Sequence, residues 1–115
     1  MAIPRILNKK TEVFSVRQMR VGDFDPTKPG CYDNVKTFPI EVRPQRALFF
    51  EIVSDVPISI AFANSDNSSV YHKEDMTDFG YGPIPTGRNR EMGILLGVYP
   101  GDKATIDLDV WMEKA

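Results

Sequence analysis

The chain has 115 residues, of which 42% are hydrophobic and 26% are charged, and its formal net charge is −2. This length and balance predict one globular domain over residues 1–115 and exclude a disordered chain. The slight negative charge argues against nucleic-acid binding, which needs a broad basic surface, and no apolar run approaches the ~20 residues that cross a bilayer.

Residues 1–10 are expected to form a flexible N-terminal arm. The apolar positions of this arm come before Lys9 and Lys10, which reverses the charge order of a secretory signal, so we expect a cytoplasmic or otherwise intracellular protein. Cys31 is the single cysteine, which agrees with a reducing compartment and excludes a zinc site built from several thiolates.

Two strands separated by a loop are predicted in the first part of the chain. Residues 11–21 are rich in strand-forming side chains, whereas residues 22–34 contain two prolines, two glycines and three aspartates and are predicted to be a loop. Residues 35–43 alternate apolar and polar positions. Pro39 within them indicates an edge strand or a bulge, because proline cannot donate to a sheet ladder.

Residues 47–53 and 57–64 are predicted to be two strands joined by residues 54–56. Each carries apolar side chains at every second position, which places those side chains on one face of a sheet. Six of them are predicted to form half of the core: Leu48, Phe50, Ile52, Ile58, Ile60 and Phe62.

Residues 65–90 are predicted to be one long loop, because only residues 69–73 have any strand character. Loops longer than about 12–15 residues are uncommon in compact domains and are often functional when they are ordered. We therefore expect a binding site in this segment.

The C-terminal segment, residues 91–114, is predicted to be an antiparallel hairpin. Its centre, Tyr99-Pro100-Gly101-Asp102, is typical of a type II turn with proline in the second position and glycine in the third. In the returning strand, one face is apolar and is expected to join the core: Ala104, Ile106, Leu108, Val110 and Met112.

No segment has the apolar spacing of an amphipathic helix over three turns. About seven to eight short strands, separated by Gly and Pro turns, predict an all-β fold, either an antiparallel sandwich or a jelly-roll-like barrel.

Residues 46–64, RALFFEIVSDVPISIAFAN, resemble the GOLD domain, a β-sandwich module of Golgi-trafficking and lipid-transfer adaptor proteins. In that family a hydrophobic strand ends in a Ser-Asp corner and a short strand of the form D-I-x-F-x-V follows. Gly97-Val98-Tyr99, leading towards the alternating residues 105–112, is a second similar feature, although Pro100-Gly101-Asp102 departs from the family pattern. The resemblance implies an interaction module without catalysis.

Asp107 and Asp109 are the first candidates for catalysis, because residues two apart on a strand share a face about 7 Å apart, within the general range of paired glycosidase carboxylates. His72, the only histidine, is the candidate for imidazole chemistry, alone or with Cys31. A small β-fold hydrolase is therefore the third hypothesis, and a solvated sheet face is the alternative explanation of the two acids. Because no nucleophile elbow and no calcium-loop spacing occur, enzyme activity is the less favoured hypothesis but stays open, and we expect no cofactor and no metal.

The leading hypothesis is a non-enzymatic module that binds a protein partner or itself in a homo-oligomer. It rests on Trp111, which is predicted to lie on the solvent-facing side of the last strand and needs a cover. The alternative is a lectin-like module that binds carbohydrate or another small ligand through aromatic and polar side chains of the long loop. The candidate binding residues are Tyr71, His72, Asp75, Tyr81, Arg88, Arg90 and Trp111.

Overall fold

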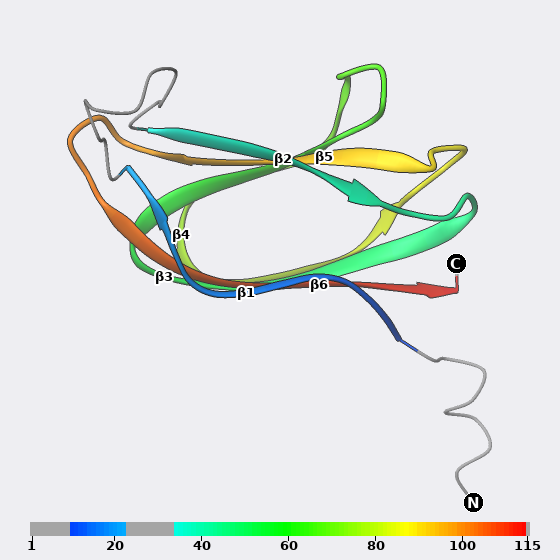
Figure 1. The fold of residues 1–115 in the computed structure, drawn as a ribbon, viewed down its shortest axis with the longest axis horizontal. Coiled ribbons are helices and arrows are strands. Elements are labelled where there is room, and N and C mark those ends of the chain that lie inside the picture. The colour runs from blue at the N-terminus through cyan, green and yellow to red at the C-terminus, as the bar shows by residue number, and fades with distance from the viewer. Residues whose placement is uncertain (1–9, 23–33, 115) are drawn as a thin grey trace, which may run out of the picture.

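The computed structural model describes residues 10–22 and 34–114, which form six strands in two facing layers (Figure 1). The strands are β1 (Thr11–Val21), β2 (Val35–Glu41), β3 (Arg46–Ala63), β4 (Ser69–Pro85), β5 (Glu91–Val98) and β6 (Ala104–Lys114). Residues 1–9 of the predicted arm, most of the predicted loop at 22–34 and Cys31 lie outside the described residues. No helix in the described part of the chain is long and apolar enough to cross a membrane.

Strand β3 is the centre of the fold because it belongs to both layers. Its first part, residues 46–54, pairs with β6, and its last part, residues 58–63, pairs with β5, while β4 runs along its other side. Since β6 also pairs with β1 and β5 with β2, one layer has the order β1-β6-β3-β4 and the other β2-β5-β3-β4. Figure 1 shows β3 and β4 curving together from the lower layer to the upper one.

The predicted all-β antiparallel sandwich is therefore confirmed, with six strands in place of seven to eight. Residues 47–53 and 57–64, predicted as separate strands, form one strand that bends where its register against β4 shifts between Val53 and Ile58. At the bend the Ser54 hydroxyl donates to the Val56 carbonyl at 2.7 Å, and Asp55 accepts from the backbone N–H of Thr105 at 2.8 Å. These side-chain bonds stabilise the corner.

The predicted hairpin over residues 91–114 is wrong, although its turn is correct. The N–H of Asp102 donates to the carbonyl of Tyr99 at 2.9 Å and Gly101 has φ +90°, as a type II turn requires. However, β5 pairs with β2 and β3, whereas β6 pairs with β1 and β3, so the turn carries the chain from one layer to the other. Both strands direct an apolar face into the core between the layers. A crossover buries these two faces as well as a hairpin would, so the apolar pattern is compatible with both connections.

The predicted long loop at residues 65–90 is also wrong, because most of it is β4, a strand of 17 residues. Among the strands that the structure describes, β4 pairs only with β3 and is the edge of both layers. An edge strand tolerates the charges, glycines and prolines that made this segment resemble a loop. Two short turns at residues 64–68 and 86–90 are what remains of the predicted loop. Strand β2 lies at the opposite edge, as Pro39 predicts.

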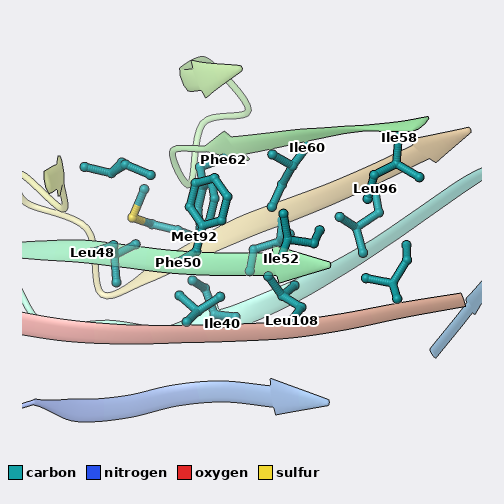
Figure 2. Packing of buried hydrophobic residues seen from close by; sticks show 14 of the residues in the cluster. Ile40, Leu48, Phe50, Ile52, Ile58, Ile60, Phe62, Met92, Leu96 and Leu108 are labelled. Atoms are coloured by element: carbon teal, nitrogen blue, oxygen red, sulfur yellow. The ribbon is translucent and has the colours of Figure 1, made fainter. Parts of the chain in front are cut away.

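The core between the layers contains all eleven side chains predicted for it, each at most 6% exposed. Figure 2 shows side chains from the two layers meeting there, among them Phe50, Phe62 and Leu108. Fully burying one such side chain contributes about 1.5–3 kcal/mol to folding. At the β1–β2 side, the rings of Phe14 and Phe38 stack at 4.6 Å and cover the core.

Candidate functional site

Tyr71 and Tyr81 are two predicted binding residues that the fold brings together. They pair with Phe62 and Phe50 in the two different layers, and the bend of β4 stacks their rings at a centroid distance of 4.2 Å and an interplanar angle of 15°. Tyr71 is partly buried, and this burial raises the pKa of its hydroxyl. Tyr81 is more exposed, with 43% of its surface accessible. Tyr71 and Phe79 pack against the core on the β4 side, and the ring of Phe79 is 6.5 Å from that of Tyr81.

The other predicted binding residues of β4 and the following turn lie apart from this stack. His72 is exposed, with Nε2 3.5 Å from Oε1 of Glu74, which is also exposed. Asp75 accepts a hydrogen bond from the hydroxyl of Tyr99, and this bond raises the pKa of Tyr99. Arg88 and Arg90 are exposed in the β4–β5 turn. No hydrogen bond, ion pair or ring contact in the described residues joins these four side chains to Tyr71 or Tyr81.

Trp111 lies on the outer face of the layer that contains β6, where neighbouring side chains cover part of it. Its ring is nearly parallel to that of Phe49, with centroids 6.0 Å apart. The indole N–H donates to Glu113 at 2.8 Å, and the ammonium of Lys10 lies 4.5 Å from the ring centroid. The cover expected for Trp111 thus comes in part from adjacent strands.

Asp107 and Asp109, the candidate catalytic pair, both bind β1. Asp109 accepts two bonds from the guanidinium of Arg17, at 3.0 and 3.1 Å, and one from the Ser15 hydroxyl at 2.7 Å. Asp107 accepts from the backbone N–H of Gln18, whose φ of 54° marks an irregular point in β1. The bonds from Arg17 and Ser15 hold the pKa of Asp109 below its usual value. A lowered pKa is the opposite of what a general acid needs, so these contacts favour a structural role.

We expect Asp109→Asn to lower the free energy of unfolding by at most about 1 kcal/mol at neutral pH, because water screens this exposed pair. The carboxylate contributes fully above the unfolded-state pKa of 3.8, and its contribution is lost as the pH falls through the lower pKa of the folded state. Urea unfolding of both proteins across this pH range measures the effect. If the difference in the free energy of unfolding between the two proteins is unchanged well below pH 3.8, the prediction is wrong.

A groove of about 500 Å³ lies on the outer face of the other layer. Its floor is a cross-strand row in which Pro39 of β2, Gly93 of β5 and Ala63 of β3 are neighbours, with Leu95 beside them. A Cβ atom built on Gly93 would meet no atom within 4 Å, so the glycine leaves the floor open. Glycine in the interior of a strand often marks a place where a ligand or another backbone approaches closely.

One wall of the groove is the β3–β4 turn at residues 64–68, which rises beyond the upper layer in Figure 1. Hydrogen bonds fix this turn to the next one: the amide of Asn89 donates to Asn64 at 2.7 Å and accepts from the Ser65 hydroxyl at 3.1 Å. Asn64 also bonds with Ser68, through its N–H to the Ser68 carbonyl at 2.8 Å. The wall is therefore held in place by hydrogen bonds to the neighbouring turn and within itself.

Three polar side chains at the groove remain available for a ligand. Within residues 10–22 and 34–114, the hydroxyl of Thr37, the amide of Asn67 and the carboxylate of Glu91 have no side-chain hydrogen bond or ion pair. None of them was among the predicted binding residues. The available signals were weak: a glycine inside an apolar strand and a turn rich in Asn and Ser.

No group of three or more His, Cys, Asp and Glu residues that could hold a metal ion occurs in the described ranges. No family model and no curated protein matches the sequence. Among solved structures, the chain is similar to a carbohydrate-binding module, CBM36, in complex with calcium and xylotriose, with 12% identity over 90% of this chain and 98% of that chain and a TM-score of 0.44. None of these findings tests the resemblance to the GOLD domain, which stays a prediction.

Proposed function

We propose that the protein is a non-enzymatic binding module that takes a carbohydrate in the groove above β2, β5 and the end of β3. The observation that carries the proposal is the combination of an open apolar floor at Gly93 with unpaired polar side chains at its margin. A sugar ring has the matching chemistry, because its C–H faces pack on apolar surface while its hydroxyls donate to a carboxylate and exchange bonds with an amide.

The size and mixed lining of the groove favour a small ligand over a protein partner. A volume of about 500 Å³ falls in the range of sites that bury small molecules. A stable protein interface instead buries about 800 Å² on each partner and has an apolar centre. The carboxylate of Glu91 and the amide of Asn67 fix orientation and supply specificity to an otherwise apolar site.

Gly93→Val tests the site without disturbing the fold. An added Cβ meets no atom within 4 Å, and valine is favoured over glycine in a strand, so we expect the free energy of unfolding to stay the same or rise by up to about 1 kcal/mol. The valine side chain fills the floor, so carbohydrate binding should be lost. Affinity electrophoresis of both proteins in gels that contain soluble plant, fungal or bacterial polysaccharides measures binding.

Gly97→Val is the matched control, since Gly97 lies four positions along the same face of β5 and outside the groove lining, with ordinary contact for an added Cβ. It should bind as the wild type does. Glu91→Gln should weaken binding while leaving stability unchanged. If no polysaccharide slows the wild-type protein, or if Gly93→Val is slowed equally, the proposal is wrong.

A further inference from the structure

A second hollow, of about 310 Å³, lies on the opposite outer surface of the sandwich, beside Trp111. Strands β1, β6 and β3 and the preceding Lys10 supply its lining, and the register explains why the strand side chains meet. Glu12 of β1 pairs directly with Trp111, and Glu51 of β3 pairs with Asp109, which is two positions from Trp111 on the same face. An aromatic ring is thus bordered by carboxylates from three strands.

The charges in this hollow are unbalanced. Arg17 neutralises Asp109 through its two hydrogen bonds. Glu12 and Glu51 form no ion pair within 4.0 Å in the described part of the chain, although Arg17 interacts with Glu12 at longer range. An aromatic face beside unpaired carboxylates attracts a cation, by the ring quadrupole at short range and by charge at longer range.

A cation of this kind is present. The ammonium of Lys10 lies 4.5 Å from the centroid of the Trp111 ring, which is within the range of a cation–π contact. Lys10 itself is exposed, so this contact is one of the weaker ones and can exchange with another cation. The hollow therefore accommodates a primary ammonium, and Lys10 shows the position that such a group takes.

We propose that this hollow is a docking site for a lysine side chain of a partner protein, and that Lys10 occupies it in the absence of the partner. The ligand is a primary ammonium on a flexible stem, the same group that Lys10 supplies. The stem packs on the ring while the ammonium lies near Glu12 and Glu51. Because Lys10 is tethered beside the site, it competes with an incoming lysine.

The test uses the fluorescence of Trp111, which is the only tryptophan of the chain and so reports on the site alone. The probe is Nα-acetyl-lysine amide, titrated at constant ionic strength. We expect a saturable change with the wild type and an affinity about twofold to fivefold higher with Lys10→Gln, which is the factor that an exposed cation–π contact is worth. A Glu12→Gln, Glu51→Gln double variant should bind more weakly than the wild type.

Lys36→Gln is the matched control, because it removes the same charge from β2 in the other layer and should leave the affinity unchanged. The Nε-acetylated probe, which carries no charge, should cause no saturable change. The proposal is overturned if Lys10→Gln shows no saturable response to the charged probe or responds equally to both probes. Loss of this site leaves polysaccharide binding in the opposite groove unaffected, so the two proposals fail independently.

Discussion

Replacing Phe50 with alanine is expected to lower the free energy of unfolding by about 3–5 kcal/mol, the usual cost of deleting a buried ring. Phe50 is fully buried, and its ring centroid lies 5.3 Å from that of Phe62, 5.9 Å from Tyr71 and 6.1 Å from Phe79. These neighbours come from both layers, so the cavity would open where the layers meet. Urea unfolding monitored by circular dichroism measures the change.

A loss of this size is a large part of the stability of an ordinary domain, which is about 5–15 kcal/mol. Phe50→Leu keeps most of the apolar volume and should cost clearly less than Phe50→Ala. Val53→Ala is the control on the same strand, because Val53 is 51% exposed and its truncation should change stability by no more than about 0.5 kcal/mol. If Phe50→Ala and Val53→Ala have equal effects, Phe50 is not at the centre of the core.

The second large effect is expected at Gly82 of β4, where alanine should cost about 1–3 kcal/mol through overpacking. A Cβ atom at this position would overlap the ring of Phe49 on the outer face. Phe49 would have to move, and its near-parallel contact with Trp111 would be lost. We expect a lower urea midpoint and a shift in the fluorescence of Trp111.

The collision has a direct rescue. In a Phe49→Ala background the ring is absent, so Gly82→Ala should cost much less than it does in the wild type. Gly93→Ala is the control for a glycine whose added Cβ meets nothing, and it should not destabilise the fold. Equal costs of Gly82→Ala with and without the Phe49 ring would show that contact with this ring is not the cause.

The alternation of apolar and polar residues was sufficient to predict the core. Leu48, Phe50 and Ile52, and likewise Ile106 and Leu108, lie inside as their spacing requires, because a strand with one buried face needs an apolar side chain at every second position. The type II turn at Pro100-Gly101 was predictable for the same local reason. Local patterns carry this information because it depends on neighbours in sequence.

Pairing of strands was not predictable, because it depends on residues far apart in sequence. The turn at residues 99–102 fits a hairpin and a crossover equally well, and the choice follows from which strands lie beside β5 and β6. Strand β4 was missed because bulges shift its register at several points, which interrupts the alternation. In addition, charged side chains are common both at an exposed sheet edge and in loops, so the charges of β4 did not distinguish the two.

The candidate groove was missed for a different physical reason. Its floor includes residues with a small side chain or none, such as Ala63 and Gly93. These residues carry no reactive group, so the sequence does not mark them as part of a site. Trp111 was recognised as unusual from the sequence. However, its neighbours Glu12 and Glu51 precede it in the sequence by 99 residues (111 − 12) and 60 residues (111 − 51). Only the register of β1, β6 and β3 brings them together.

Strand β1 lies at one edge of its layer, so it lacks a pairing partner during much of the synthesis of the chain. Its partner is β6, and the hydrogen-bonded residues Ser15 and Asp109 are 94 positions apart. At 5–20 residues per second, β1 waits about 5–20 s on the ribosome before β6 exists. The bulges of β1 and its charged side chain at Arg17 discourage pairing with other nascent chains during that interval. The same Arg17 then binds Asp109 when the last strand arrives.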